Sequence, residues 1–202
     1  MKKIITVCFI IFLGVIGFFI GKNHVQFAAP KQQGAIVQQT SPSIQPSIVQ
    51  QQSIVGLPKR LIIQKIGVTA KVESVGLDAE EKMDIPKNVQ NVAWYNLGVK
   101  PGELGNAVID GHYDTATGAP AVFYSITKLK SGDILKVTDE NDKEYIFSIT
   151  RTQTYDFDKI PISEIFGPSA IARLNLITCG GVWDKKNKNY LKRIVVYSEI
   201  AK

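Results

Sequence analysis

The sequence predicts an all-β fold, a closed eight-stranded barrel with short helices, preceded by an N-terminal transmembrane helix. Three observations lead to this prediction. Residues 57–202 contain eight short runs rich in Val, Ile, Tyr and Phe, separated by Gly, Pro, Asn and Asp. Helical patterns in this region are confined to two short pieces, and one apolar stretch lies near the N-terminus. Closure into a barrel removes exposed strand edges.

The apolar stretch, residues 4–20, reads IITVCFIIFLGVIGFFI and is flanked by Lys2, Lys3 and Lys22. As a helix it would span about 25 Å, and lysines that extend toward the headgroups let it cross a bilayer. A cleaved signal peptide is the alternative, but bulky residues stand where a small-x-small cleavage site needs small ones. Residues 1–22 are therefore predicted to be an uncleaved single-pass anchor in the cell membrane. The flanking lysines place the N-terminus in the cytoplasm and the remaining chain outside.

Residues 23–56 are rich in Gln, Pro and Ser and have few large apolar side chains, so they are predicted to form a flexible tether. The folded domain is then 57–202. Residues 1–56 hold four lysines and no acidic residue, whereas residues 57–202 hold the other 20 basic residues and all 18 acidic ones. Such a mixed surface has no dense basic stripe, which argues against a nucleic-acid partner.

The strands, the helical pieces and the turns follow from local composition. A turn is expected at 139–143 (DENDK), a loop at 180–190 (GGVWDKKNKNY), and single helical pieces at 121–129 and 161–167, the second with Ser163 as its cap. The strands are expected at 60–68, 71–77, 91–96, 106–112, 133–139, 143–156, 172–179 and 190–200.

Cys179 is the only cysteine in the predicted extracellular domain, since Cys8 lies in the apolar stretch. It cannot form an intramolecular disulfide there. It closes the apolar strand RLNLITC and precedes Gly180 and Gly181, which would let a ligand approach the backbone closely. Two interpretations follow from the residues alone: a buried strand cysteine before a turn, or a reactive nucleophile.

His112 is the only histidine of the same domain, and it also follows a strand, in AVIDGHYD. A lone histidine can be a satisfied polar residue or an acid/base catalyst. One His and one Cys lack the companion ligands that zinc requires, so no metal site and no cofactor is predicted. Together, Cys179 and His112 fit a thiol nucleophile paired with an imidazole acid/base.

Arg193 lies on the strand after Cys179, where an antiparallel return would bring it beside the thiol. A guanidinium there could stabilise the thiolate or an oxyanion. Lys192 would point to the opposite face by strand alternation. Asp110 and Asp114 flank His112 and could bias its charge, or could equally be turn-capping residues.

The segments GHYD, VFYSITKLKSGD and LNLITCGG, followed by an arginine on the final strand, resemble the sortases. These are membrane-anchored cysteine transpeptidases of mainly Gram-positive bacteria. The likeness covers about Leu57 to Lys202 and extends to the anchor and tether. The motifs PGELGNAVIDGHYD and TCGGVWD are most similar to those of class F, with class D next. Asn175 is a departure, because the family motif T-L-x-T-C usually begins with Thr.

The resemblance implies a sortase-like catalytic barrel and assigns Cys179 as the nucleophile, His112 as the catalytic histidine and Arg193 as the catalytic arginine. It implies LPxTG-like surface proteins as acyl donors, and a peptidoglycan peptide or a pilin lysine as the acceptor amine. Thr178, Tyr113 and Trp183 are expected to contact substrate.

Two other functions fit the residues. A hydrolytic cysteine peptidase would use the same thiol, although papain-like enzymes place Cys before His in the chain. A non-catalytic anchored β-domain could instead bind a cell-wall polymer through Tyr113, Trp183 and Tyr190, with Cys179 in its core.

Overall fold

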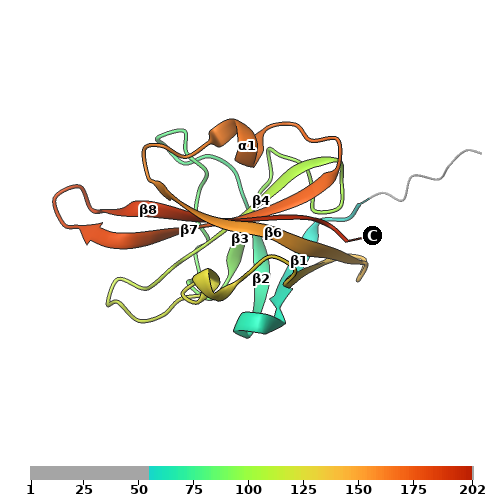
Figure 1. Cartoon of the computed structure of the whole chain (residues 1–202), viewed down its shortest axis with the longest axis horizontal. Helices are drawn as coiled ribbons and strands as arrows, with labels where there is room; N and C mark the ends of the chain where they lie inside the picture. The colour runs from blue at the N-terminus through green and yellow to red at the C-terminus, as the bar shows by residue number, and fades with distance from the viewer. Residues whose placement is uncertain (1–54, 202) are drawn as a thin grey trace, which may run out of the picture. The chain divides into compact units, whose positions relative to one another are not determined.

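The computed structural model describes residues 55–201, in which eight strands close into one barrel (Figure 1). This confirms the predicted all-β barrel. The predicted membrane anchor (1–22) and nearly all of the predicted tether (23–56) lie outside the described residues. The strands are β1 (Pro58–Ile63), β2 (Val68–Val75), β3 (Val92–Tyr95), β4 (Gly105–Gly111), β5 (Ile134–Asp139), β6 (Glu144–Asp156), β7 (Ala172–Asp184) and β8 (Asn189–Ile200).

The strand order around the barrel is β1-β2-β3-β4-β7-β8-β6-β5, and β5 pairs with β1 to close it. Two of the pairings are parallel, β2 with β3 and β4 with β7, and the others are antiparallel. The β4–β7 pairing brings the segment before His112 beside the segment before Cys179. Because both strands run in the same direction, their C-terminal ends meet at the same end of the barrel.

The side chains of each strand alternate between the barrel interior and its outer face. On β7, Leu174 and Leu176 are fully buried in the interior cluster, as are Ile194 and Val196 on β8. A second, smaller cluster lies on the outer face, where Ile165 packs with residues of the sheet. Its buried members are Val108, Ile165, Val195 and Tyr197. Odd-numbered residues of β7 as far as Cys179, and of β8 from Arg193 onward, therefore face outward.

Helical structure is limited in the described chain to two 3₁₀ turns, η1 (Gln64–Ile66) and η2 (Ile126–Lys128), and the α-helix α1 (Ile162–Phe166). Both predicted helical pieces are thus present in shortened form. α1 packs against β4 on the outer side of the barrel (Figure 1). The prediction of Ser163 as a helix cap is wrong. The N-cap residue is Pro161, and Ser163 lies inside the helix, where its carbonyl accepts the Gly167 N–H.

The β5–β6 turn forms as predicted, because the buried Asp139 organises it. Its carboxylate accepts the backbone N–H groups of Asn141, Lys143 and Gly56, the last of which precedes β1. At the other end of β1 the predicted run 60–68 is divided. Gly67 has φ 69°, a left-handed conformation that glycine adopts without strain, and β2 begins directly after it.

The predicted loop at 180–190 is wrong, because most of it continues β7 and β8 as a hairpin (Figure 1). A bulge between Gly180 and Trp183 absorbs the glycines, and Gly181 takes a φ of 77°. Pairing then resumes between Trp183 and Tyr190. Only residues 185–188 form the turn, so Cys179 lies within a long strand and not at its end.

Candidate active site

Cys179 is a free, half-buried thiol on the outer face of β7. The neighbouring Thr178 points the opposite way, is fully buried and donates its hydroxyl to the Gly111 carbonyl at 2.6 Å. This bond ties β7 to the end of β4. The structure thus gives Thr178 the function of holding two strands in place, whereas its predicted contact with substrate stays a prediction.

Arg193 is the direct cross-strand partner of Cys179 in the β7–β8 ladder. Side chains of directly paired residues lie on the same face, so the guanidinium and the thiol share the outer face, as expected from the sequence. The guanidinium donates to the carbonyls of Tyr190 and Lys192, each at 3.0 Å, and to Asn189 Oδ1 at 2.9 Å. These acceptors are uncharged, so the positive charge of Arg193 is not neutralised by them.

Lys192 does not join the site. Its ammonium group bonds to Asp156, the residue that pairs with it on β6. Because Lys192 and Arg193 are consecutive in a strand, their side chains point to opposite faces. The prediction that only one of the two cations can serve the thiol therefore agrees with the positions of both side chains.

His112 follows directly after β4 and is half-buried. In the parallel ladder Asp110 pairs with Ile177, so two residues further along both chains His112 comes level with Cys179. Its backbone carbonyl accepts the Phe123 N–H at 2.9 Å. A Cβ at Gly111 would lie 2.6 Å from the Phe123 ring, so this close approach requires glycine directly before His112.

The imidazole of His112 makes its hydrogen bond to the carbonyl of Pro86, with Nε2 at 2.9 Å from that oxygen. A carbonyl oxygen only accepts, so Nε2 carries a proton and donates it. The ring orientation is therefore set by the segment before β3. The other ring nitrogen, Nδ1, is the one left for acid/base exchange.

The resting thiol of Cys179 is uncharged. Burial raises its pKa above the ordinary value, Arg193 acts to lower it, and the carboxyl groups of Asp110 and Asp114 raise it further. Arg193 therefore only partly offsets the other effects. A thiolate at this site would need further stabilisation by positive charge close to the sulfur.

Asp110 and Asp114 differ in their surroundings. Asp114 accepts a hydrogen bond from the Tyr190 hydroxyl, so it joins the segment after β4 to the β7–β8 hairpin. Asp110 lies within β4 on the outer face and not in a turn, which contradicts the turn-capping interpretation for this residue. Burial raises the pKa of Asp110 to about 7. In the sequence, Asp110 stands out as a carboxylate at an outward position of an otherwise apolar strand.

An aromatic row borders the site at the hairpin. The ring of Tyr190 lies 5.2 Å from that of Trp183 and 6.0 Å from that of Tyr113, and Tyr113 in turn lies 5.1 Å from Tyr124. Trp183 remains 46% exposed. The structure thus brings Tyr113 and Trp183 together at one edge of the site, while their contact with substrate stays a prediction.

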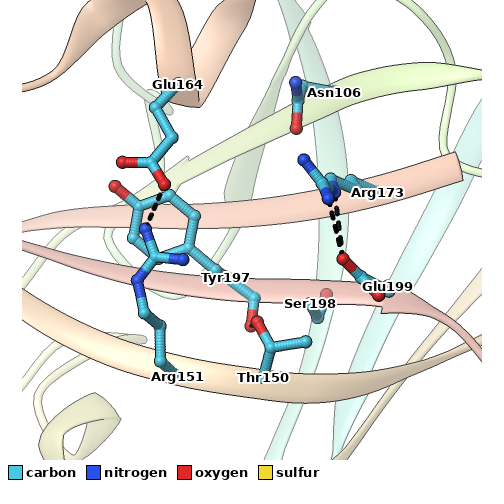
Figure 2. A pocket seen from close by; sticks show the side chains of 8 residues that line it. All are labelled: Asn106, Thr150, Arg151, Glu164, Arg173, Tyr197, Ser198 and Glu199. Atoms are coloured by element: carbon cyan, nitrogen blue, oxygen red, sulfur yellow. Dashed lines mark hydrogen bonds and ion pairs between the residues drawn. The ribbon is translucent and has the colours of Figure 1, made fainter. Parts of the chain in front are cut away.

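A cavity of about 110 Å³ lies toward the other end of β7 and β8 (Figure 2). Along β7, Arg173 precedes Cys179 by about 20 Å at roughly 3.3 Å per residue. The charged groups there are paired: Arg173 with Glu199, and Arg151 with Glu164 (Figure 2). The remaining lining residues are Asn106, Thr150, Tyr197 and Ser198.

Asn175, the departure from the usual family motif, lies fully buried between these two regions. Its amide donates to Asn106 Oδ1 at 3.1 Å and to the Ile165 carbonyl at 2.8 Å. It therefore connects β7 to β4 and to α1. Its own Oδ1 has no partner in the described chain.

A closed barrel that carries a free thiol between an arginine and a histidine is the architecture of the cysteine transpeptidases. The model of the sortase domain matches residues 61–201, and the chain belongs to the sortase family. No curated protein matches the chain.

Solved sortase structures share the fold. Sortase C-1 of Actinomyces oris has a TM-score of 0.57 at 17% identity, and the match covers 71% of this chain and 73% of that one. Sortase A of Listeria monocytogenes has a TM-score of 0.54 at 23% identity, covering 74% and 89%. A sortase D5 transpeptidase of Clostridium perfringens has a TM-score of 0.53 at 21% identity, covering 73% and 79%.

No helix within residues 55–201 is long and apolar enough to cross a membrane. The described chain also contains no group of three His, Cys, Asp or Glu side chains placed to hold a metal ion.

Proposed function

We propose that this chain is a membrane-anchored cysteine transpeptidase that cleaves an LPxTG-like sorting signal and transfers the acyl group to an amine of the cell wall or of a pilin. The observation that carries the proposal is the cross-strand pair of Cys179 and Arg193, with His112 level with the thiol on the adjacent parallel strand. The anchor is residues 1–22, which leaves the barrel outside the cell. The sequence motifs around His112 and Cys179 favour class F, with class D next.

In the first step the Cys179 thiol gives its proton to Nδ1 of His112, and the sulfur attacks the carbonyl of the Thr–Gly bond. A C–S bond forms, the carbonyl oxygen takes up negative charge, and the Arg193 guanidinium stabilises this oxyanion. The C–N bond then breaks as His112 protonates the departing glycine amine. The product is a thioester on Cys179, which an amine resolves in the second step.

The test uses the full-length chain in detergent with a labelled LPxTG peptide, with and without an added amine. We expect a peptide thioester on Cys179 by mass spectrometry, none in Cys179→Ala, and an amide product that depends on the amine. Product formed only with water would indicate a hydrolytic peptidase instead. If Cys179 reacted with alkylating reagents only after denaturation and no thioester formed, the chain would be a non-catalytic binding domain.

A further inference from the structure

Asp110 is an ionisable group in a row of apolar side chains beside the nucleophile. Across three adjacent strands its ladder partners are Ile177 on β7 and, beyond it, Val195 on β8. Val108, the preceding outward residue of β4, is also buried in the outer cluster. A carboxyl group in such a row loses hydration without gaining apolar contacts, so its presence calls for a chemical explanation.

Within residues 55–201 no side chain donates a hydrogen bond to Asp110 or forms an ion pair with it. The backbone N–H of Gly111 is its hydrogen-bonding partner, and Arg193 acts on it only electrostatically. Asp114, the other acid close to Cys179, accepts a hydrogen bond from the Tyr190 hydroxyl. Of the charged groups, Arg193 from β8 acts on Asp110 electrostatically, and Asp110 in turn acts on the Cys179 thiol from β7. The β3 ladder partner of Asp110, Ala93, is uncharged.

For the first step of the reaction Asp110 is a disadvantage. Its charge disfavours the thiolate and so raises the pKa of Cys179. Once the thioester has formed, the sulfur no longer bears charge and this penalty disappears. The incoming amine is then an ammonium ion at neutral pH, which must be held near the thioester and must lose a proton before it can attack. A carboxylate without a side-chain partner suits both tasks.

We propose that Asp110 binds the ammonium group of the acceptor and takes its proton as the amine attacks the Cys179 thioester. The inference rests on the proposed transpeptidase function and assigns a residue to the acceptor amine, which is cationic at neutral pH.

The step balances as follows. One proton of the ammonium group passes to the Asp110 carboxylate, and the neutral amine forms a C–N bond to the thioester carbonyl. The C–S bond breaks, and the second proton of the amine ends on the Cys179 sulfur, whose raised pKa favours the neutral thiol. The products are an amide, a free thiol and a neutral Asp110, which then returns its proton to solvent.

The experiment compares two nucleophiles on the full-length chain in detergent with a labelled LPxTG peptide. Glycinamide is largely cationic at neutral pH, whereas hydroxylamine is largely uncharged. In Asp110→Asn we expect the KM for glycinamide to rise about tenfold, the effect of losing one charge-assisted contact, with the KM for hydroxylamine unchanged. Asp110→Glu keeps the charge and should keep most of the affinity for glycinamide.

Asp114→Asn is the matched control, because it removes the other acid that reaches Cys179 electrostatically. It should leave the ratio of the two KM values unaltered. The release of the leaving peptide reports thioester formation separately and should persist in Asp110→Asn, which also shows that the variant folds. An equal change for both nucleophiles, or no change for either, overturns the acceptor role while leaving the transpeptidase intact. Absence of any Cys179 thioester in the unmodified chain overturns both proposals.

Discussion

The two ends of the outer face of β7 and β8 differ in whether their charged side chains are paired with opposite charges. In the cavity of Figure 2, each arginine has a carboxylate partner: Arg173 bonds to Glu199 at 2.9 Å, and Arg151 bonds to Glu164 while its guanidinium stacks 3.7 Å from the Tyr197 ring centroid. These pairs are mutually neutralised. Such a region is well suited to hold strands together and poorly suited to stabilise new charge.

At the other end, Arg193 donates to two carbonyls and one amide oxygen, and Asp110 has no side-chain partner among residues 55–201. The hydrogen bonds fix the guanidinium in place without cancelling its charge. The comparison shows that hydrogen bonds can hold a charged side chain in position without neutralising its charge. A site that must meet charge developing during a reaction needs the first without the second.

The largest expected effect comes from replacing the arginine at each end in turn. Arg193→Ala should slow thioester formation about 10²- to 10³-fold, the usual consequence of losing an oxyanion donor. Arg173→Ala, its matched control at the paired end, should change the rate by less than about twofold because only an exposed ion pair is lost. Stopped-flow release of a labelled leaving peptide measures both. Similar losses in the two variants would refute the distinction.

A smaller effect is expected for Asn175, which lies between the two ends. In Asn175→Ala the Ile165 carbonyl and Asn106 Oδ1 lose their donor, so the free energy of unfolding should fall by about 1–3 kcal/mol. Urea denaturation followed by tryptophan fluorescence measures this. Asn187→Ala, which removes an exposed amide in the β7–β8 turn, is the control and should leave the denaturation midpoint nearly unchanged. Equal midpoints for the two variants would contradict the assigned bonds.

Asp110, at the end that carries Cys179, should affect the pKa of the thiol. Because the Asp110 carboxylate disfavours the thiolate, Asp110→Asn should lower the pKa of Cys179, and iodoacetamide should alkylate it several-fold faster at neutral pH. Arg193→Gln removes the opposing influence and should shift the pH profile of alkylation upward. The rate is measured against pH for each variant. Profiles that coincide with that of the unmodified chain would show that neither group acts on the sulfur.

The smallest effects are expected at the paired end. Glu164→Gln and Glu199→Gln each break an ion pair whose members are about two-fifths exposed, so each should lower the free energy of unfolding by less than about 1 kcal/mol. Added salt should shrink the difference further, because it screens exposed charges. Thermal unfolding at low and high salt provides the measurement. A larger loss, or one that salt does not change, would indicate that these pairs act as buried charges.

Much of this organisation follows from local sequence patterns. The eight strands, the turn closed by Asp139 and the position of Arg193 opposite Cys179 all result from strand periodicity and turn composition. The failures have physical causes. The two glycines Gly180 and Gly181 predict a loop, although a bulge can absorb two glycines without ending a strand.

Other features depended on contacts distant in the sequence. Ser163 is a good capping residue by type, but the preceding Pro161 begins the helix and leaves Ser163 inside it. The environment of Asp110 is created by Ile177 and Val195, which only the β4–β7 pairing brings beside it. No local pattern contains that information, so the strand could be predicted while the surroundings of its carboxyl group could not.

The hydrogen bond from Thr178 to Gly111 joins residues separated by 67 positions along the chain. Pairings of such long range form late in folding, because the entropy of closing the loop opposes them until neighbouring contacts are made. Before these pairings form, the Cys179 sulfur is therefore not held beside Arg193 and His112. The chain is therefore inactive while it folds, and catalysis begins only when the barrel has closed.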